Sequence, residues 1–91
     1  MSGNTPISPH AAFGQVLRKH RLAAGLSQEQ LGLESGVQRN FISLIETGQN
    51  QPTIGTIFKL AGALQMSASA LVLEAERELA VKSKNRRSTA L

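Results

Sequence analysis

The sequence predicts an all-α fold, a compact bundle of five helices joined by short connections. Apolar residues recur three and four positions apart along most of the chain, whereas no stretch alternates apolar and polar residues as a strand does. Residues that favour helix ends, chiefly serine, threonine and glycine, separate these stretches. We expect a flexible leader over residues 1–12, one folded domain over 13–79 and a disordered basic tail over 80–91.

The first two helices are predicted from apolar spacing and from the residues at their ends. The first carries four apolar residues at helical spacing: Phe13, Val16, Leu17 and Ala24. Gly25 then ends the pattern. Ser27 follows as an N-cap, and Gln30, three residues later, completes a capping box for the second helix. Gly36 ends that helix, because glycine permits the left-handed conformation of a sharp turn.

Three further helices follow by the same reasoning. The third is predicted from about Gln38 to Gly48. Thr53 caps a fourth, whose inner stripe has five members: Ile54, Ile57, Leu60, Ala61 and Leu64. Ser67 caps a fifth, which fades after Leu79 and whose inner residues are Leu71, Val72 and Ala75.

The connection between the second and third helices is the most informative part of the sequence. Gly32 is small enough to let the two helices approach, and Gly36 permits the turn between them. Leu31, Ile42 and Ile45 are spaced to anchor both helices on the core. These are the requirements of a helix-turn-helix, whose second helix is free to lie in the major groove of DNA.

The charge distribution alone gives weak support for nucleic-acid binding. The net charge is +4, but the six basic and six acidic residues before Ala80 cancel. The surplus lies in the tail, where it predicts a solvated segment rather than a binding surface. RNA binding by this tail is a weaker reading, because few aromatic residues are available to stack on bases.

No enzymatic, cofactor or metal function is predicted. The chain has no Cys and only two distant histidines, His10 and His20, so a metal site is not indicated. The carboxylates of the fifth helix lie two positions apart and point in different directions: Glu74, Glu76 and Glu78. A secretory signal, a membrane-spanning stretch of roughly 20 apolar residues and a small-molecule site are not evident either. We therefore expect a cytoplasmic protein without cofactor.

Four segments carry a more specific pattern: residues 26–31 (LSQEQL), 35–37 (SGV), 41–46 (FISLIE) and 52–53 (PT). This run resembles the Cro and phage-repressor family of helix-turn-helix regulators, also called the xenobiotic-response-element (XRE) family, over about residues 13–76. The resemblance implies a lambda-repressor-like five-helix domain whose third helix is the recognition helix. Two positions depart from the family pattern. The usual alanine of the second helix is Gly32, and the usual arginine before the closing glycine is Thr47, which would remove a phosphate or structural contact.

The resemblance also implies DNA contacts for individual residues. The base contacts would be Gln38, Arg39, Asn40, Ser43 and Leu44. Arginine suits guanine and asparagine suits adenine, because each matches a pair of groups on the major-groove edge. The phosphate contacts would be Gln28, Asn50 and Thr53. Two alternatives stay open: Arg39 contacts only phosphate or solvent, and Thr53 acts only as an N-cap.

Arg21 and Glu46 match the family's ion pair, which would orient the recognition helix; the alternative is two unrelated surface charges. Phe41 and Leu44 lie off the inner stripe of the third helix and could touch thymine methyl groups, although for Phe41 core packing is the favoured interpretation.

Together these features predict a small stand-alone transcriptional regulator, a repressor or controller, that binds double-stranded DNA. We expect a homodimer on a palindromic operator, because a single recognition helix buries little surface. Its interface would involve the fourth and fifth helices through Phe58, Val72 and Leu73. The alternative function is a protein-interaction module, such as an antitoxin, that binds a partner through apolar residues like Leu33 and Leu73.

Overall fold

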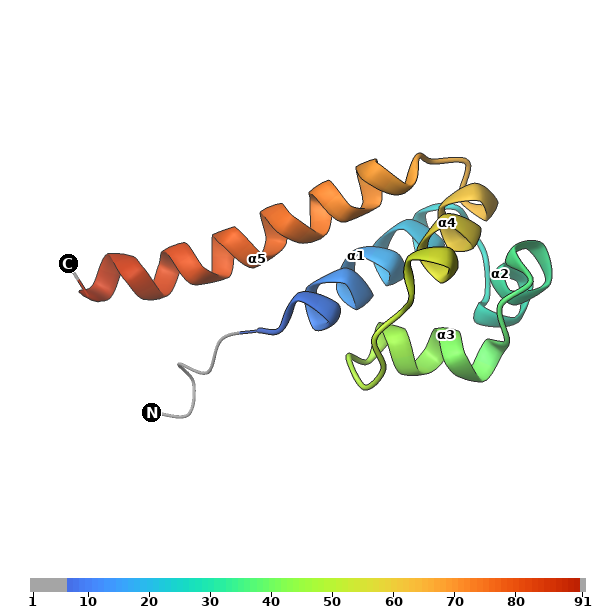
Figure 1. The fold of residues 1–91 in the computed structure, drawn as a ribbon, viewed down its shortest axis with the longest axis horizontal. Coiled ribbons are helices and arrows are strands. Elements are labelled where there is room, and N and C mark those ends of the chain that lie inside the picture. Colours follow the sequence, from blue (N-terminus) through green and yellow to red (C-terminus); the bar gives the residue numbers. More distant parts are fainter. Residues whose placement is uncertain (1–6, 91) are drawn as a thin grey trace.

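The computed structural model describes residues 7–90, with side chains over residues 7–82. Five helices follow one another along the chain: α1 (Pro9–Ala23), α2 (Gln28–Ser35), α3 (Arg39–Glu46), α4 (Ile54–Ala63) and α5 (Ala68–Ala90). The described residues contain no strand. The all-α, five-helix prediction is confirmed (Figure 1).

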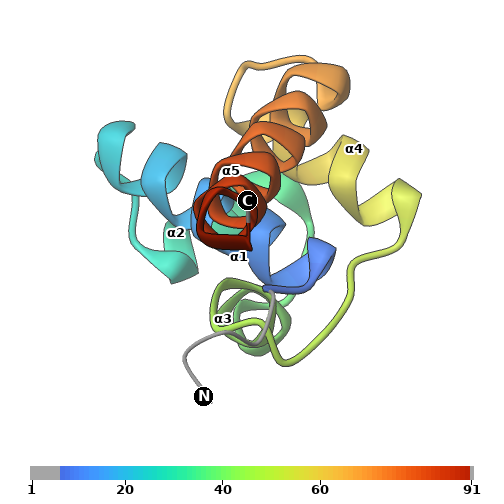
Figure 2. The same cartoon turned by 90° about the vertical axis from the view of Figure 1, so that its left-hand side faces the viewer.

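Helix α1 is the central element. It lies between α5 on one side and α3 on the other (Figure 1). The view along α5 shows α3 below α1 and α4 to its right (Figure 2), and α2 contacts both α3 and α4. All five helices contribute to a single core: Phe13, Val16, Leu17, Leu31, Val37, Ile42, Ile45, Leu60, Ala61, Leu71 and Ala75. Because α3 packs on the side of α1 away from α5, its outer face is left open.

The predicted helix ends are present. Ser27 caps α2, and Gln30 returns the bond to the Ser27 backbone, which completes the capping box. Thr53 caps α4 by accepting a hydrogen bond from the Thr56 backbone N–H at 3.1 Å. Gly36 ends α2 in the left-handed conformation, with φ 77°, which costs a residue without a Cβ nothing. The turn between α2 and α3 therefore forms as the sequence predicts.

Two glycines permit close approaches of the backbone. A Cβ on Gly32 would lie 2.8 Å from the Val37 carbonyl oxygen, so the predicted need for a small residue in α2 is confirmed. A Cβ on Gly14 would collide with the Ile45 carbonyl oxygen, and this contact between α1 and α3 was not predicted.

Helix α1 begins at Pro9, four residues before the predicted start of the folded domain. Ser8 caps the helix through a hydrogen bond from the Ala11 backbone N–H, and Pro9 occupies the first turn, where its missing N–H is not needed. Of the predicted leader, residues 1–6 lie outside the described residues, whereas residues 9–12 are helical.

Helix α5 continues to Ala90, where the sequence predicts a disordered tail from Ala80. A Glu78–Lys82 ion pair of 3.2 Å, four residues apart, supports the helix at the start of the predicted tail. No single described helix is long and apolar enough to cross a membrane, although α4 and the first part of α5 reach that length together, across a bend of 106°.

Three residues of the predicted inner stripes are exposed instead. Ala24 follows the last residue of α1 and lies at its C-cap. Ile54 begins α4 and is 74% exposed, because the first turn extends beyond the core. Val72 is 45% exposed beside the fully buried Leu71, since neighbouring positions of a helix face different directions.

Helix α5 is joined to α1 by a small cluster of charges. Glu74 Oε1 lies 2.9 Å from His20 Nε2 and 3.4 Å from Lys19 Nζ. The hydrogen bond with His20 lowers the pKa of the Glu74 carboxyl below its ordinary value, and Lys19 adds to the effect. The ionised carboxylate therefore stabilises the fold above the pKa of the unfolded chain, and this contribution is lost as the pH falls through the lowered pKa of the folded state.

We expect Glu74→Gln to reduce the free energy of unfolding at pH 7 by up to about 1 kcal/mol, because the pair is partly exposed. The difference from wild type should shrink below about pH 4. Chemical denaturation across the acid range measures it. Glu76→Gln, an exposed carboxylate of the same helix, is the control, and an equal, pH-independent loss in both variants would contradict the role of Glu74.

Candidate nucleic-acid interface

Helix α3 has an inner face that packs against the core and an outer face that does not. Ile42 and Ile45 are fully buried on the inner face. Phe41 is half-buried and packs against the core, so the packing interpretation of this residue is confirmed. Leu44 is half-buried. Helix α3 is thus held by its apolar stripe, which leaves the opposite side for other contacts.

The residues predicted to contact bases lie on this helix. Gln38, Arg39 and Asn40 are exposed at its N-terminal end, and Ser43 is half-buried one turn on, next to Leu44. Within residues 7–82, Arg39 forms no ion pair with another residue of the domain, and its exposed guanidinium is accessible to solvent. All five lie in α3 or at its N-cap, and α3 forms one edge of the fold (Figure 1).

Arg21 of α1 and Glu46 of α3 form a buried ion pair. Arg21 Nε lies 2.6 Å from Glu46 Oε2, and Arg21 Nη2 lies 2.9 Å from Glu46 Oε1. The side chains are only 8% and 3% exposed. The hydrogen bonds to Glu46 raise the pKa of the Arg21 guanidinium above its ordinary value, against the opposing effect of burial. The pair is therefore a fixed connection between α1 and α3 and not two separate surface charges.

The two residues of this ion pair also form hydrogen bonds with residues at the start of α2. Arg21 Nη1 donates to the Leu26 carbonyl oxygen at 2.9 Å, and Gln28 Nε2 donates to Glu46 Oε1 at 3.1 Å. Gln28, a predicted phosphate contact, is the first residue of α2 and is half-buried. The link between Gln28 and Glu46 was not predicted, because no local spacing in the sequence connects the two positions.

The loop after α3 holds the remaining predicted contacts. Asn50 is half-buried, and its backbone N–H donates to the Leu44 carbonyl oxygen at 3.2 Å. Thr53 is exposed and acts as the N-cap of α4. Thr47, in place of the family's arginine, donates its hydroxyl to the Ser43 carbonyl oxygen at 3.0 Å. Thr47 therefore helps to close the end of α3.

Helix α2, the turn at Gly36 and helix α3, fixed on α1 by a buried ion pair, define a helix-turn-helix DNA-binding domain. The helix-turn-helix family model HTH_3 matches residues 17–71. The chain belongs to this family of XRE-type transcriptional regulators, which act by binding DNA, as the sequence predicts.

Individual relatives agree with this assignment. The chain is 36% identical over 59 residues to an uncharacterised HTH-type transcriptional regulator, y4dJ of Sinorhizobium fredii, and the match covers 65% of this chain and 77% of that protein. It spans only 40–44% of the length of three further curated relatives, all described as HTH-type transcriptional regulators.

Solved structures show the same fold. The restriction-modification controller protein C.AhdI from Aeromonas hydrophila is 42% identical, with a TM-score of 0.66, over 68% of this chain and 94% of that one. The clp gene regulator ClgR from Corynebacterium glutamicum superposes with a TM-score of 0.82 over 91% of this chain and 88% of that one. Because ClgR is only 22% identical to this chain, its similarity shows the fold alone.

Proposed function

We propose that this protein is a small repressor or controller that binds double-stranded DNA in a sequence-specific manner, with α3 in the major groove. The observation that carries the proposal is the division of α3 into a buried aliphatic stripe and an exposed polar end. A helix fixed in this way presents the same side chains to every DNA molecule, which sequence recognition requires. This function places the protein in the cytoplasm.

Within this proposal Arg39 is the principal base-reading residue. It is exposed at the N-terminal end of α3, where its fork can reach the two acceptors of a guanine. Asn40 and Gln38 flank it and suit adenine in the same groove. Gln28, Asn50 and Thr53 would bond the phosphates on either side, which fixes the position of α3 without reading sequence.

We expect Arg39→Ala to lose about 5- to 150-fold in affinity for the operator and little for unrelated DNA, because a bidentate base contact discriminates by about 1–3 kcal/mol. The measurement is fluorescence anisotropy against the DNA upstream of the protein's own gene and a shuffled copy, at two salt concentrations. Arg77→Ala, which removes an exposed arginine from α5, is the matched control and should keep the preference.

Two other results would contradict the proposed sequence recognition by α3 or the proposed role of Arg39. If wild type binds both DNAs alike and its affinity collapses as the salt concentration rises, counterion release explains all of the binding. Sequence reading by α3 would then be wrong. If Arg39→Ala lowers the affinity for both DNAs equally, Arg39 contacts phosphate and not a base.

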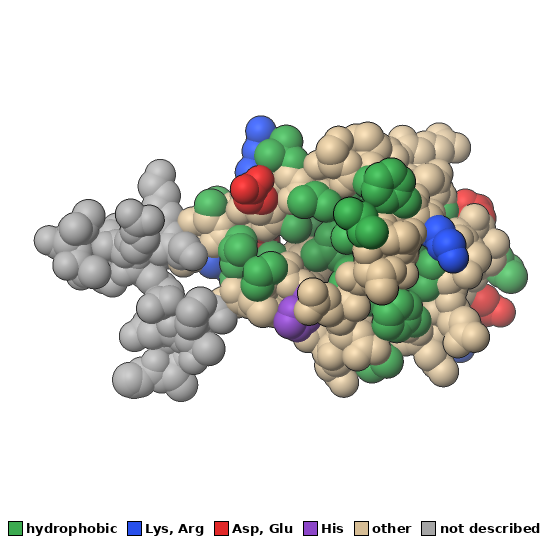
Figure 3. Space-filling view, in the orientation of Figure 1, with side chains coloured by type: hydrophobic (Ala, Val, Ile, Leu, Met, Phe, Trp, Pro, Cys, Tyr) green, Lys and Arg blue, Asp and Glu red, His purple; other side chains and the backbone are tan. Residues whose placement is uncertain are grey.

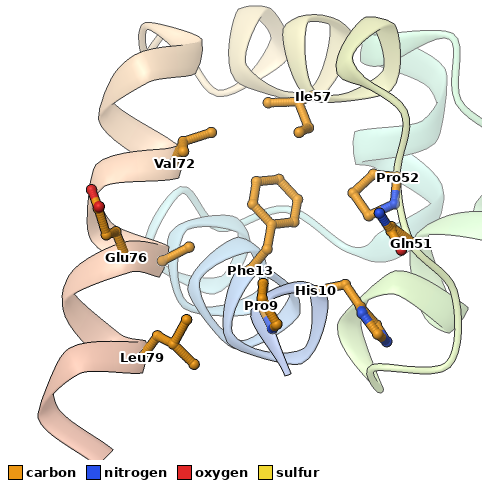
Figure 4. A pocket seen from close by; sticks show the side chains of 10 residues that line it. Pro9, His10, Phe13, Gln51, Pro52, Ile57, Val72, Glu76 and Leu79 are labelled. Atoms are coloured by element: carbon orange, nitrogen blue, oxygen red, sulfur yellow. The ribbon is translucent and has the colours of Figure 1, made fainter. Parts of the chain in front are cut away.

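We also propose that two copies associate through α4 and α5, so that two recognition helices read two half-sites about one helical turn apart. Phe58, Val72 and Leu73 are 63%, 45% and 43% exposed. Hydrophobic side chains gather on the face shown in Figure 3. An apolar groove of about 380 Å³ opens between α1, α4 and α5, with Phe13 at its base and Ile57 and Val72 on its sides (Figure 4).

Light scattering tests this dimer. Wild type at micromolar concentration should have twice the 9.7 kDa mass of the chain, whereas Phe58→Glu should move toward the mass of one chain, because a charge in a buried contact is strongly unfavourable. Leu33→Glu, at an exposed apolar residue of α2, should keep the dimer. A wild-type mass of one chain, both free and on DNA, would contradict the proposal.

A further inference from the structure

The carboxylate of Glu46, at the end of α3, accepts a hydrogen bond from the first residue of α2. Glu46 Oε1 accepts hydrogen bonds from Arg21 Nη2 at 2.9 Å and from Gln28 Nε2 at 3.1 Å, while Glu46 Oε2 accepts from Arg21 Nε at 2.6 Å. Glu46 belongs to the recognition helix, and Gln28 is the first residue of α2. The single buried side chain of Glu46 therefore bonds residues of both α1 and α2.

The chemistry of these groups fixes the orientation of the Gln28 amide. A carboxylate is an acceptor only, so it bonds the nitrogen of the amide and not its oxygen. The carboxylate itself cannot turn, because Arg21 holds both of its oxygens and the Glu46 side chain is only 3% exposed. One amide hydrogen is used in this way. The second amide hydrogen of the half-buried Gln28 side chain takes no part in that bond.

This orientation matters for binding a phosphate. A glutamine whose amide is free to rotate presents its oxygen as readily as its nitrogen, and the oxygen repels a phosphate. Fixing the side chain before DNA arrives also avoids the loss of conformational freedom on binding. Arg21 contributes further by holding the Leu26 carbonyl, two residues before Gln28, and thereby the backbone that leads into α2.

We propose that Glu46 is a positioning residue that orients Gln28 for its bond to the DNA backbone, so that the ion pair with Arg21 sets the phosphate contact as well as the recognition helix. This inference rests on the proposed DNA-binding function. It assigns to Glu46 a role in DNA affinity, although the side chain is buried and does not touch DNA itself.

The test is a double-mutant comparison of DNA affinity. In wild type, Gln28→Ala should weaken binding to the upstream DNA by about 3- to 10-fold, the effect of one hydrogen bond. In the Arg21→Met/Glu46→Leu background, which lacks the carboxylate but buries no lone charge, the same substitution should change affinity less than about 2-fold. Asn50→Ala is the control, since its effect should be equal in both backgrounds. Arg21→Lys keeps the carboxylate and should retain the Gln28 effect.

A second measurement needs no DNA. In the ¹H–¹⁵N spectrum of the free protein, the Gln28 side-chain NH₂ signals should be displaced from those of exposed glutamines and should exchange slowly with solvent. The signals should return to the positions of exposed glutamines in Arg21→Met/Glu46→Leu and should stay displaced in Arg21→Lys. Ordinary signals in wild type, or an equal loss of affinity on Gln28→Ala in both backgrounds, would overturn the proposal. The spectrum is recorded without DNA. It therefore tests the hydrogen bond between Gln28 and Glu46 even if the protein shows no preference for the upstream DNA.

Discussion

Replacing Gly14 by alanine should lower the free energy of unfolding by about 3 kcal/mol or more, although alanine is the better helix former. The added Cβ would collide with the Ile45 carbonyl oxygen and would lie 3.1 Å from the Glu46 carbonyl oxygen. These atoms belong to the backbone of α3 and cannot move aside as a flexible side chain does. Either α1 or α3 has to shift, which disturbs the core around Ile42 and Ile45 and the ion pair at Glu46.

Gly62→Ala is the matched control for this prediction. Gly62 lies within α4, and a Cβ on it would meet nothing within 4 Å. The same chemical change should therefore stabilise the protein by about 0.5–1 kcal/mol, since it only reduces the freedom of the unfolded chain. Urea denaturation of both variants measures the difference. Similar stabilities for the two variants would show that α1 and α3 do not approach as closely as the structure indicates.

The contrast between Gly14 and Gly36 shows what the sequence can predict. Gly36 was predicted because its role depends on neighbouring residues, namely the end of α2 and the start of α3. The caps at Ser27 and Thr53 are local in the same sense. The role of Gly14 depends on Ile45, far along the chain, and a glycine inside a helical pattern gives no sign of which backbone will pass over it.

The candidate site divides in the same way. The face of α3 follows from helical periodicity, so the positions of Arg39 and its neighbours at one end of the helix could be predicted. Their DNA contacts remain a proposal. The family resemblance pointed to the pairing of Arg21 with Glu46, but its burial and its bond to Gln28 depend on how three helices meet. Periodicity describes one helix at a time and cannot provide that information.

Removing one partner of the buried ion pair should be among the most harmful substitutions in the domain. Glu46→Ala leaves the Arg21 guanidinium, whose side chain is 8% exposed, without its carboxylate, and it also leaves Gln28 without its acceptor. We expect a loss of about 3–5 kcal/mol in the free energy of unfolding, because an unpaired buried charge is strongly unfavourable.

Replacing both partners separates this penalty from the net contribution of the pair. Arg21→Met/Glu46→Leu removes both charges and fills similar space, so it should stay within about 1–2 kcal/mol of wild type or exceed it. Denaturant unfolding of the single and double variants measures both quantities, and anisotropy with the upstream DNA then measures function. We expect a folded double variant that binds DNA more weakly, because the pair holds α3 and Gln28 in place in addition to any stability it contributes. Full affinity in a folded double variant would show that apolar packing alone is sufficient to orient the recognition helix.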